Sequence, residues 1–85
     1  MRGFVRSSDY KAIAAVLAKA RRDAGITQRD LAKRVGVLPS IIAKIELGER
    51  RLDVFELVAI ARAVSLDPHI LLDKVLDAVP EEASP

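Results

Sequence analysis

Apolar residues recur every three or four positions along most of the chain, a spacing typical of amphipathic helices. No stretch of useful length alternates apolar and polar residues, so we expect no strands. Glycines and prolines that favour turns separate the helical runs. The pattern therefore predicts an all-α fold with five helices, which run from residue 8 or 9 to 24 and over about 28–35, 39–47, 54–64 and 68–78.

Capping residues mark where the later helices begin. Thr27 and Asp30 have the spacing of a capping box, and so do Asp53 and Glu56. Asp67 is placed to cap the last helix. The chain is long enough for one small domain. We expect an N-terminal arm over 1–8, a single helical domain over 9–79 and a flexible tail over 80–85.

The segment TQRDLAKRVGVLPSIIAKIELG, residues 27–48, has the layout of a helix-turn-helix, which places its second helix in the major groove of DNA. If Gln28 is the first position, the small Ala32 lies where the two helices cross. Gly36 then lies in the turn, where a permissive backbone is needed. The residues that would lock the second helix onto the first are Val37, Ile42 and Ile45. The segment therefore predicts a DNA-binding unit.

The pieces GITQRDLA, GV followed by SIIAKIE, and LGERRLD resemble the Cro/repressor-type (xenobiotic-response-element-like, XRE) helix-turn-helix regulators. The resemblance covers roughly residues 10–76 and implies a five-helix, phage-repressor-like DNA-binding domain in which the second and third helices form the helix-turn-helix. One departure concerns the residue before the recognition helix. It is commonly Ser or Thr in this family and here is Leu38, which removes an N-cap oxygen, although Pro39 presets φ for the first helical turn.

The resemblance also implies the residues that meet DNA. The base-reading positions fall on Pro39, Ser40, Ile41, Ala43 and Lys44. The phosphate-binding positions fall on Thr27, Gln28, Arg50 and Arg51. Finally, the resemblance pairs Arg21 with Glu46 as a structural ion pair, which would tie the first helix to the recognition helix.

Two assignments have structural alternatives. Ile41 is adjacent to the buried face marked by Ile42 and Ile45, so an exposed side chain there would pack on thymine methyl groups. Ile41 could instead be half-buried against the second helix. The cations on the second helix are either weaker phosphate contacts or solvated charges, and they are Arg29, Lys33 and Arg34.

Charge is divided unevenly along the chain. Residues 1–51 hold 12 basic and 5 acidic side chains, a net charge of +7, whereas residues 52–85 hold 2 basic and 7 acidic ones, a net charge of −5. The basic half contains the helix-turn-helix. This asymmetry favours a polyanion as partner of that half.

Composition narrows the function classes. The chain has no cysteine, which excludes disulfides, thiolate metal sites and cysteine nucleophiles. Its single histidine, His69, has no obvious metal-ligand spacing, and no serine has a nucleophile context. We therefore expect no cofactor, no metal site and no enzymatic activity. The N-terminus lacks the apolar run of a signal peptide and no stretch is long enough to span a membrane, so we expect a soluble cytoplasmic protein.

The last helix carries more apolar residues than one core-facing stripe requires. Ile70, Leu71 and Val75 would serve the core. Leu72, Leu76 and Val79 would then lie on a neighbouring face and form a homodimer interface.

The function predicted from these features is a sequence-specific transcriptional regulator of double-stranded DNA, most simply a repressor that acts as a homodimer on a palindromic operator. One alternative is a restriction–modification controller protein. A second is an antitoxin that also contacts a toxin as its protein partner. A third is a protein-interaction module without DNA binding, against which the basic residues around the motif argue.

Overall fold

The computed structural model describes residues 7–81, and within them it has five helices and no strands, which confirms the all-α fold. The helix α1 begins inside the expected arm, whose residues 1–6 lie outside the described part, as do residues 82–85 of the expected tail. The helices are α1 (Ser7–Asp23), α2 (Gln28–Val35), α3 (Pro39–Glu46), α4 (Val54–Ala63) and α5 (Pro68–Ala78).

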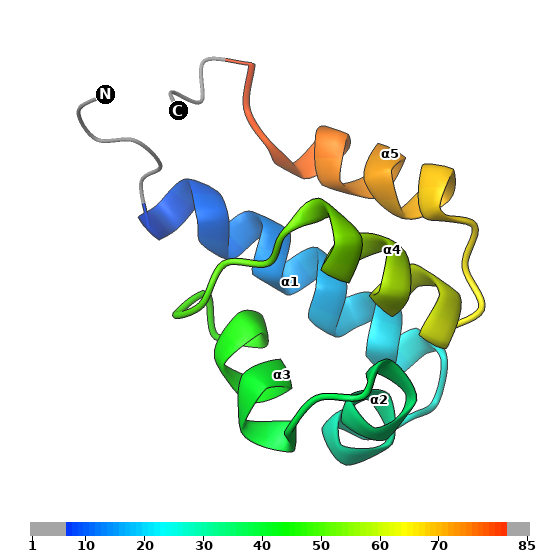
Figure 1. Ribbon diagram of the computed structural model, residues 1–85. Coiled ribbons are helices and arrows are strands. Elements are labelled where there is room, and N and C mark those ends of the chain that lie inside the picture. Colours follow the sequence, from blue (N-terminus) through cyan, green and yellow to red (C-terminus); the bar gives the residue numbers. More distant parts are fainter. Residues whose placement is uncertain (1–6, 82–85) are drawn as a thin grey trace.

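The helices α2 and α3 pack against each other as the predicted helix-turn-helix, and both are supported by neighbours. The long helix α1 contacts α3 on one side and α5 on the other, while α4 packs against α2 and α5. Figure 1 shows the α2–α3 unit and α5 at opposite ends of the molecule, with α1 and α4 between them. The recognition helix is therefore held on a rigid base, and α5 lies away from it.

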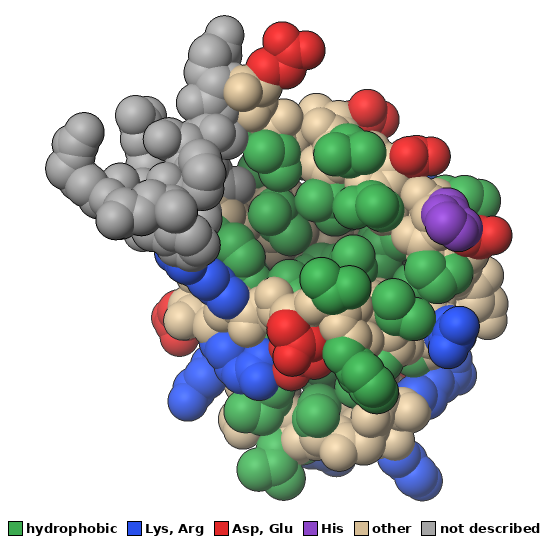
Figure 2. Space-filling model, turned by 45° about the horizontal axis from the view of Figure 1, so that its top comes forward, with side chains coloured by type: hydrophobic (Ala, Val, Ile, Leu, Met, Phe, Trp, Pro, Cys, Tyr) green, Lys and Arg blue, Asp and Glu red, His purple; other side chains and the backbone are tan. Residues whose placement is uncertain are grey.

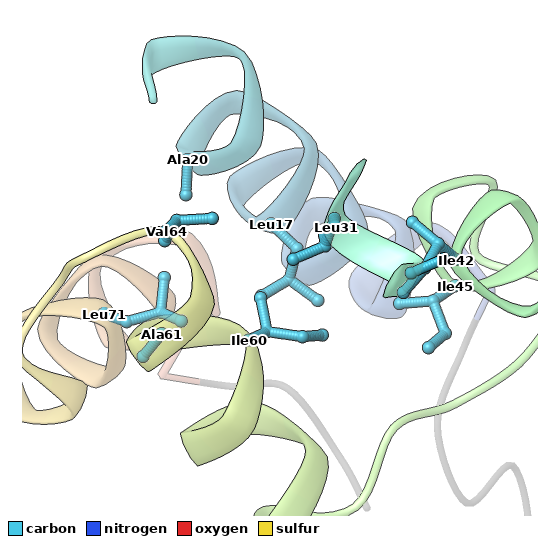
Figure 3. Close-up of a cluster of buried hydrophobic side chains, with 10 residues drawn as sticks. Leu17, Ala20, Leu31, Ile42, Ile45, Ile60, Ala61, Val64 and Leu71 are labelled. Carbon is cyan, nitrogen blue, oxygen red and sulfur yellow. The ribbon is translucent and has the colours of Figure 1, made fainter. Parts of the chain in front are cut away.

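One hydrophobic core joins all five helices. Leu17, Leu31 and Ile60 converge from α1, α2 and α4, and Figure 3 shows them at the centre of the cluster. Full burial of a side chain of this size stabilises a fold by about 1.5–3 kcal/mol. Of the three residues predicted to lock the helix-turn-helix, Ile42 and Ile45 are buried, whereas Val37 is half-buried and packs against the core. Ala32, at the crossing of the two helices, is buried as well.

The turn between α2 and α3 needs Gly36. Its φ is +87°, in the left-handed region that residues other than glycine rarely adopt. Its N–H donates to the carbonyl oxygen of Ala32 at 2.8 Å and closes the end of α2. The geometry expected for this glycine is therefore confirmed.

The structure corrects the expected core at one position of α5. Leu71 is fully buried and Val75 half-buried, as expected, but Ile70 is 48% exposed and does not serve the core. Consecutive residues of a helix point about 100° apart, so α1 and α4 cover Leu71 without covering Ile70.

The first turn of α4 also exposes apolar side chains. Val54 is 77% and Phe55 81% exposed, although Val54 lies at helical spacing, seven residues, from the buried Ala61. These two side chains are therefore not part of the core.

Candidate nucleic-acid interface

The N-terminus of α2 is fixed by a reciprocal capping box. The side chain of Thr27 accepts a hydrogen bond from the Asp30 amide at 3.0 Å, and the Thr27 amide donates to the Asp30 carboxylate at 3.1 Å. The hydrogen bond from the Thr27 amide is the main cause that holds the pKa of Asp30 below its usual range. The cap is therefore as predicted, and it leaves the first turn of α2 exposed at Thr27 and Arg29.

The carboxylate of Glu46 joins three helices. It accepts hydrogen bonds from Arg21 Nε at 2.7 Å and from a terminal nitrogen of Arg21 at 3.1 Å, which confirms the pair that the family resemblance implied. It also accepts one from Gln28 Nε2 at 2.9 Å, and Arg21 donates in addition to the carbonyl oxygen of Ile26. The angle between α2 and α3 is therefore held by a polar network as well as by the core.

Gln28 thus has a role that its sequence position did not reveal. It is half-buried, and its side-chain amide is directed to Glu46. The group of Gln28 that can bind a phosphate is therefore mainly its backbone N–H, at the start of α2. Its side chain positions α3.

The recognition helix α3 presents one face to solvent. Pro39, Ser40 and Lys44 are exposed, and Ala43 is partly exposed. Ile41 differs from the expected exposed side chain, because it is half-buried and packs against the core cluster. Only part of its surface is thus accessible to a base.

Leu38 is the N-cap of α3 and makes no side-chain capping hydrogen bond, as expected for a residue without an oxygen. Its side chain is 68% exposed. The first turn of α3 contains no acidic residue. The one basic residue of the helix, Lys44, lies in its last turn. The first turn of the recognition helix is therefore uncharged, and the residue before it is apolar and exposed.

The segment after α3 is anchored to α1 through Tyr10. The Tyr10 hydroxyl donates to the carbonyl oxygen of Arg50 at 3.3 Å and accepts from the Leu52 amide at 2.8 Å. The Arg51 guanidinium carbon lies 5.8 Å from the centroid of the Tyr10 ring, within cation–π distance. Burial raises the pKa of Tyr10. These contacts fix the position of Arg51, which is exposed.

Arg50 is engaged by the start of α4. Its two terminal nitrogens donate to the two carboxylate oxygens of Glu56 at 3.2 and 2.9 Å. Glu56 also accepts from the Asp53 amide in the predicted capping box. The hydrogen bond from Arg50 is the main cause that lowers the pKa of Glu56 from its ordinary value of 4.5.

We expect Glu56→Gln to lower the free energy of unfolding at neutral pH and to have progressively less effect in acid. A carboxyl whose folded pKa is depressed stabilises the fold above its ordinary pKa, and that contribution is lost as the pH falls through the folded value. Urea unfolding of both proteins at pH values from neutral to acid measures the difference. Glu49→Gln, at an exposed position, is the control. A difference that stays constant over this pH range would contradict the assignment.

Arg34 on α2 has a structural contact that the sequence did not suggest. Its guanidinium donates to the carbonyl oxygen of Ala63 at the end of α4, at 2.9 Å. Arg29 and Lys33, the other cations of α2, are exposed. Arg34 therefore ties α2 to α4, whereas the other two remain accessible to an anion.

The exposed side chains differ in kind between the helix-turn-helix and α5, which lie at opposite ends of the molecule. The exposed cations Arg29, Lys33 and Lys44 belong to α2 and α3, whereas Asp73 and Asp77 are exposed on α5. Figure 2 shows a broad hydrophobic area, with acidic side chains mainly along its upper part and basic ones around its lower part. Figure 1 places α5 at the upper part of the molecule.

Other kinds of site find no support in the part of the chain that the structure describes. Residues 7–81 contain no cluster of three or more His, Cys, Asp or Glu residues that could hold a metal ion. His69 is exposed at the first turn of α5. Among the same residues, no helix is long and apolar enough to cross a membrane.

Comparison with known proteins agrees with this geometry. The family model for the Helix-turn-helix family HTH_3 matches residues 17–71, which include the whole α2–α3 unit. The XRE-family like protein from Pseudomonas syringae pv. tomato is 42% identical, with a TM-score of 0.74 over 86% of this chain and 89% of that one. No protein of curated function matches.

Two further solved structures share the fold. The restriction–modification controller protein C.AhdI from Aeromonas hydrophila is 25% identical, with a TM-score of 0.71 over 76% of this chain and 94% of that one. The clp gene regulator ClgR from Corynebacterium glutamicum is 24% identical, with a TM-score of 0.75 over 82% of this chain and 74% of that one. With its helix-turn-helix and these relatives, the chain belongs to the XRE-type helix-turn-helix family of DNA-binding transcriptional regulators.

Proposed function

We propose that this protein is a sequence-specific repressor that binds a palindromic operator as a homodimer. The observation that carries the proposal is the recognition helix itself. One face of α3, which carries Pro39, Ser40 and Lys44, is exposed, while the opposite face is locked by the core and the Glu46 network. A helix held in this way can enter the major groove without losing further conformational freedom.

The base-reading set combines one charged, one polar and several apolar side chains. Lys44 can donate to guanine O6 or N7, and Ser40 can donate or accept. Pro39, Ala43 and the accessible part of Ile41 offer only apolar surface. We therefore assign base reading to Pro39, Ser40, Ile41, Ala43 and Lys44, with Lys44 as the main hydrogen-bonding group.

Phosphate contacts are assigned to residues that precede and follow the recognition helix in the sequence. Thr27 and Gln28 supply the N-terminus of α2, and Arg51 supplies a cation held by Tyr10. Arg50 is included with a second role, because its pair with Glu56 shapes the loop that carries Arg51. These contacts would set the register of α3 on the duplex.

The homodimer is assigned to a continuous apolar surface, which we call the α4–α5 face. A groove of about 550 Å³ is lined by Val54, Phe55 and Val58 of α4, with Arg34 and Arg62 among its other lining residues. Val54 also lines a second depression, which reaches Val75 on α5. On α5 the exposed Leu72 and Leu76 and the half-buried Val79 lie within about 100° of Val75 around the helix, so we assign them to the same face.

A palindromic site requires that the two recognition helices of such a dimer lie about 34–36 Å apart, one turn of DNA. Repression follows most simply, since a bound dimer covers promoter DNA in the cytoplasm. The similarity to C.AhdI favours a restriction–modification controller as the second candidate. Antitoxin activity would require a toxin as additional protein partner.

Selection of bound sequences from a random DNA pool tests the proposed function. We expect one enriched palindrome, and the logarithm of its affinity should fall linearly with the logarithm of salt concentration. Arg51→Ala should weaken binding to all sequences alike and reduce that slope by about 1. Lys74→Ala, an exposed cation on α5, is the matched control and should change neither.

The same selection tests base reading. Lys44→Ala should change the preferred bases rather than weaken all sequences equally. The proposal fails if no sequence is enriched, or if the affinity for the enriched site is flat between low and moderate salt.

A further inference from the structure

The tip of the recognition helix carries an apolar side chain in a place where a polar one would serve the fold better. An N-cap Ser or Thr would accept a hydrogen bond from an unpaired amide of the first turn, and Leu38 cannot. The Leu38 backbone has the ordinary extended N-cap conformation, with φ −73° and ψ 147°. The local structure therefore gives no reason for a leucine here.

The side chain of Leu38 also contributes nothing to the core. It is 68% exposed, and it is not among the residues packed against the hydrophobic cluster. Ile41, three residues later, differs in this respect because part of its surface packs against that cluster. Of Leu38 and Ile41, Leu38 thus offers the larger accessible fraction to a ligand.

The major groove displays few groups that such a side chain can recognise. Base edges there present hydrogen-bond donors and acceptors, which leucine cannot use, and one apolar group, the C5-methyl of thymine. A methylated cytosine carries its methyl at the same ring position. The first turn of α3 has no charged residue that would compete for the same contact.

We propose that Leu38 is a specificity-determining residue that reads the C5-methyl group of a pyrimidine in the major groove. This inference rests on the proposed function, since it requires that α3 binds DNA. It adds a residue that the family resemblance did not place among the base-reading positions. It also predicts that the protein distinguishes methylated from unmethylated pyrimidines.

The test replaces each thymine of the selected site in turn by deoxyuridine, which removes the methyl and keeps every hydrogen-bonding group. We expect wild-type affinity to fall about fourfold at one position of each half-site, the factor that burial of one methyl group provides. For Leu38→Ala the same replacement should cost less than about twofold. Leu38→Met should keep the wild-type dependence.

A second arm distinguishes the two sources of the methyl group. Each cytosine of the selected site is replaced in turn by 5-methylcytosine. Tighter wild-type binding at one such position, absent in Leu38→Ala, would identify methylcytosine as the group that is read; a deoxyuridine effect alone would identify thymine. Leu47→Ala removes an equally exposed leucine after the other end of α3 and should behave as wild type in both arms.

Several results would overturn the inference. A wild-type protein that binds the selected site but ignores every methyl change refutes the role of Leu38 and leaves the proposed function intact. A methyl dependence that survives Leu38→Ala and disappears in Ile41→Ala assigns the contact to Ile41 instead. Failure to select any DNA sequence refutes both this inference and the proposed function.

Discussion

Glu46→Ala is expected to lower the free energy of unfolding by about 3 kcal/mol, the lower end of the range for breaking a buried ion pair. The side chains of Arg21 and Glu46 are only 13% and 7% exposed. Removing the carboxylate leaves the Arg21 guanidinium largely desolvated, with its hydrogen bond to the Ile26 carbonyl oxygen, and leaves the Gln28 side-chain amide without this acceptor. Urea denaturation monitored by circular dichroism measures the loss.

This loss is a large fraction of the total stability, because the free energy of unfolding of a domain is only of order 0.05–0.15 kcal/mol per residue. Since Glu46 joins α1, α2 and α3, the variant should also lose DNA affinity under conditions where it remains folded. Glu46→Gln keeps an acceptor of the same size and should lose less. The exposed Glu49→Ala serves as the control, with an expected change within about 0.5 kcal/mol.

A double change separates the pair from its parts. In Arg21→Met/Glu46→Leu neither charge is left unpaired, so much of the lost stability should return even though the ion pair is gone. If the free energy of unfolding of Glu46→Ala lies within about 1 kcal/mol of the wild-type value, the network would have to be solvated more fully than its burial indicates.

The sequence was most informative where the responsible residues are close neighbours in the chain. The capping boxes at Thr27 and Asp53 depend on side chains three residues apart, and the turn at Gly36 depends on one backbone conformation. Such signals do not need the rest of the fold. This is why the helix bounds and the internal geometry of the helix-turn-helix were predicted closely.

Contacts between distant segments were visible only where the family resemblance supplied them. The pair of Arg21 with Glu46 was implied in that way, whereas the contact of Arg34 with the Ala63 carbonyl was not. No contact of Tyr10 was predicted from the sequence. Its hydroxyl bonds the loop some forty residues later, a contact that depends on how α1 and the loop pack.

The sequence also did not show which apolar side chains of α4 and α5 are buried. Helical spacing shows that residues share a face but not whether a neighbour covers that face. Val54 and Ile70 have apolar neighbours at the expected spacing, yet both are exposed because no other helix covers them. The exposure of Phe55 followed from no sequence pattern, and it extends the candidate dimer surface from α5 onto α4.

Leu72→Glu/Leu76→Glu is expected to convert a dimer into a folded monomer and to lower operator affinity by at least about a hundredfold. Both leucines are exposed on the α4–α5 face, at 43% and 61%, so charges there are tolerated in the monomer. In a dimer they would be buried without partners, which is costly. A monomer that engages one half-site loses the affinity gained from two linked contacts, commonly about 10²–10⁴-fold.

Sedimentation at micromolar concentration measures the assembly, and titration of the selected palindrome measures the affinity. Ile70→Glu is the matched control, because it adds the same charge at an exposed apolar position about 200° around α5 from Leu72. It should remain a dimer and bind as wild type. Phe55→Glu tests the α4 part of the same face and should also dissociate the dimer.

The combination of outcomes identifies the interface. If both the double variant and Phe55→Glu are folded monomers while Ile70→Glu is a dimer, the contact spans α4 and α5 on the side of Leu72. A dimer that survives the double change with its fold intact would place the interface elsewhere on the molecule. In that case the two recognition helices would be spaced by a different surface, and the half-site separation of the selected DNA would have to be explained by that surface instead.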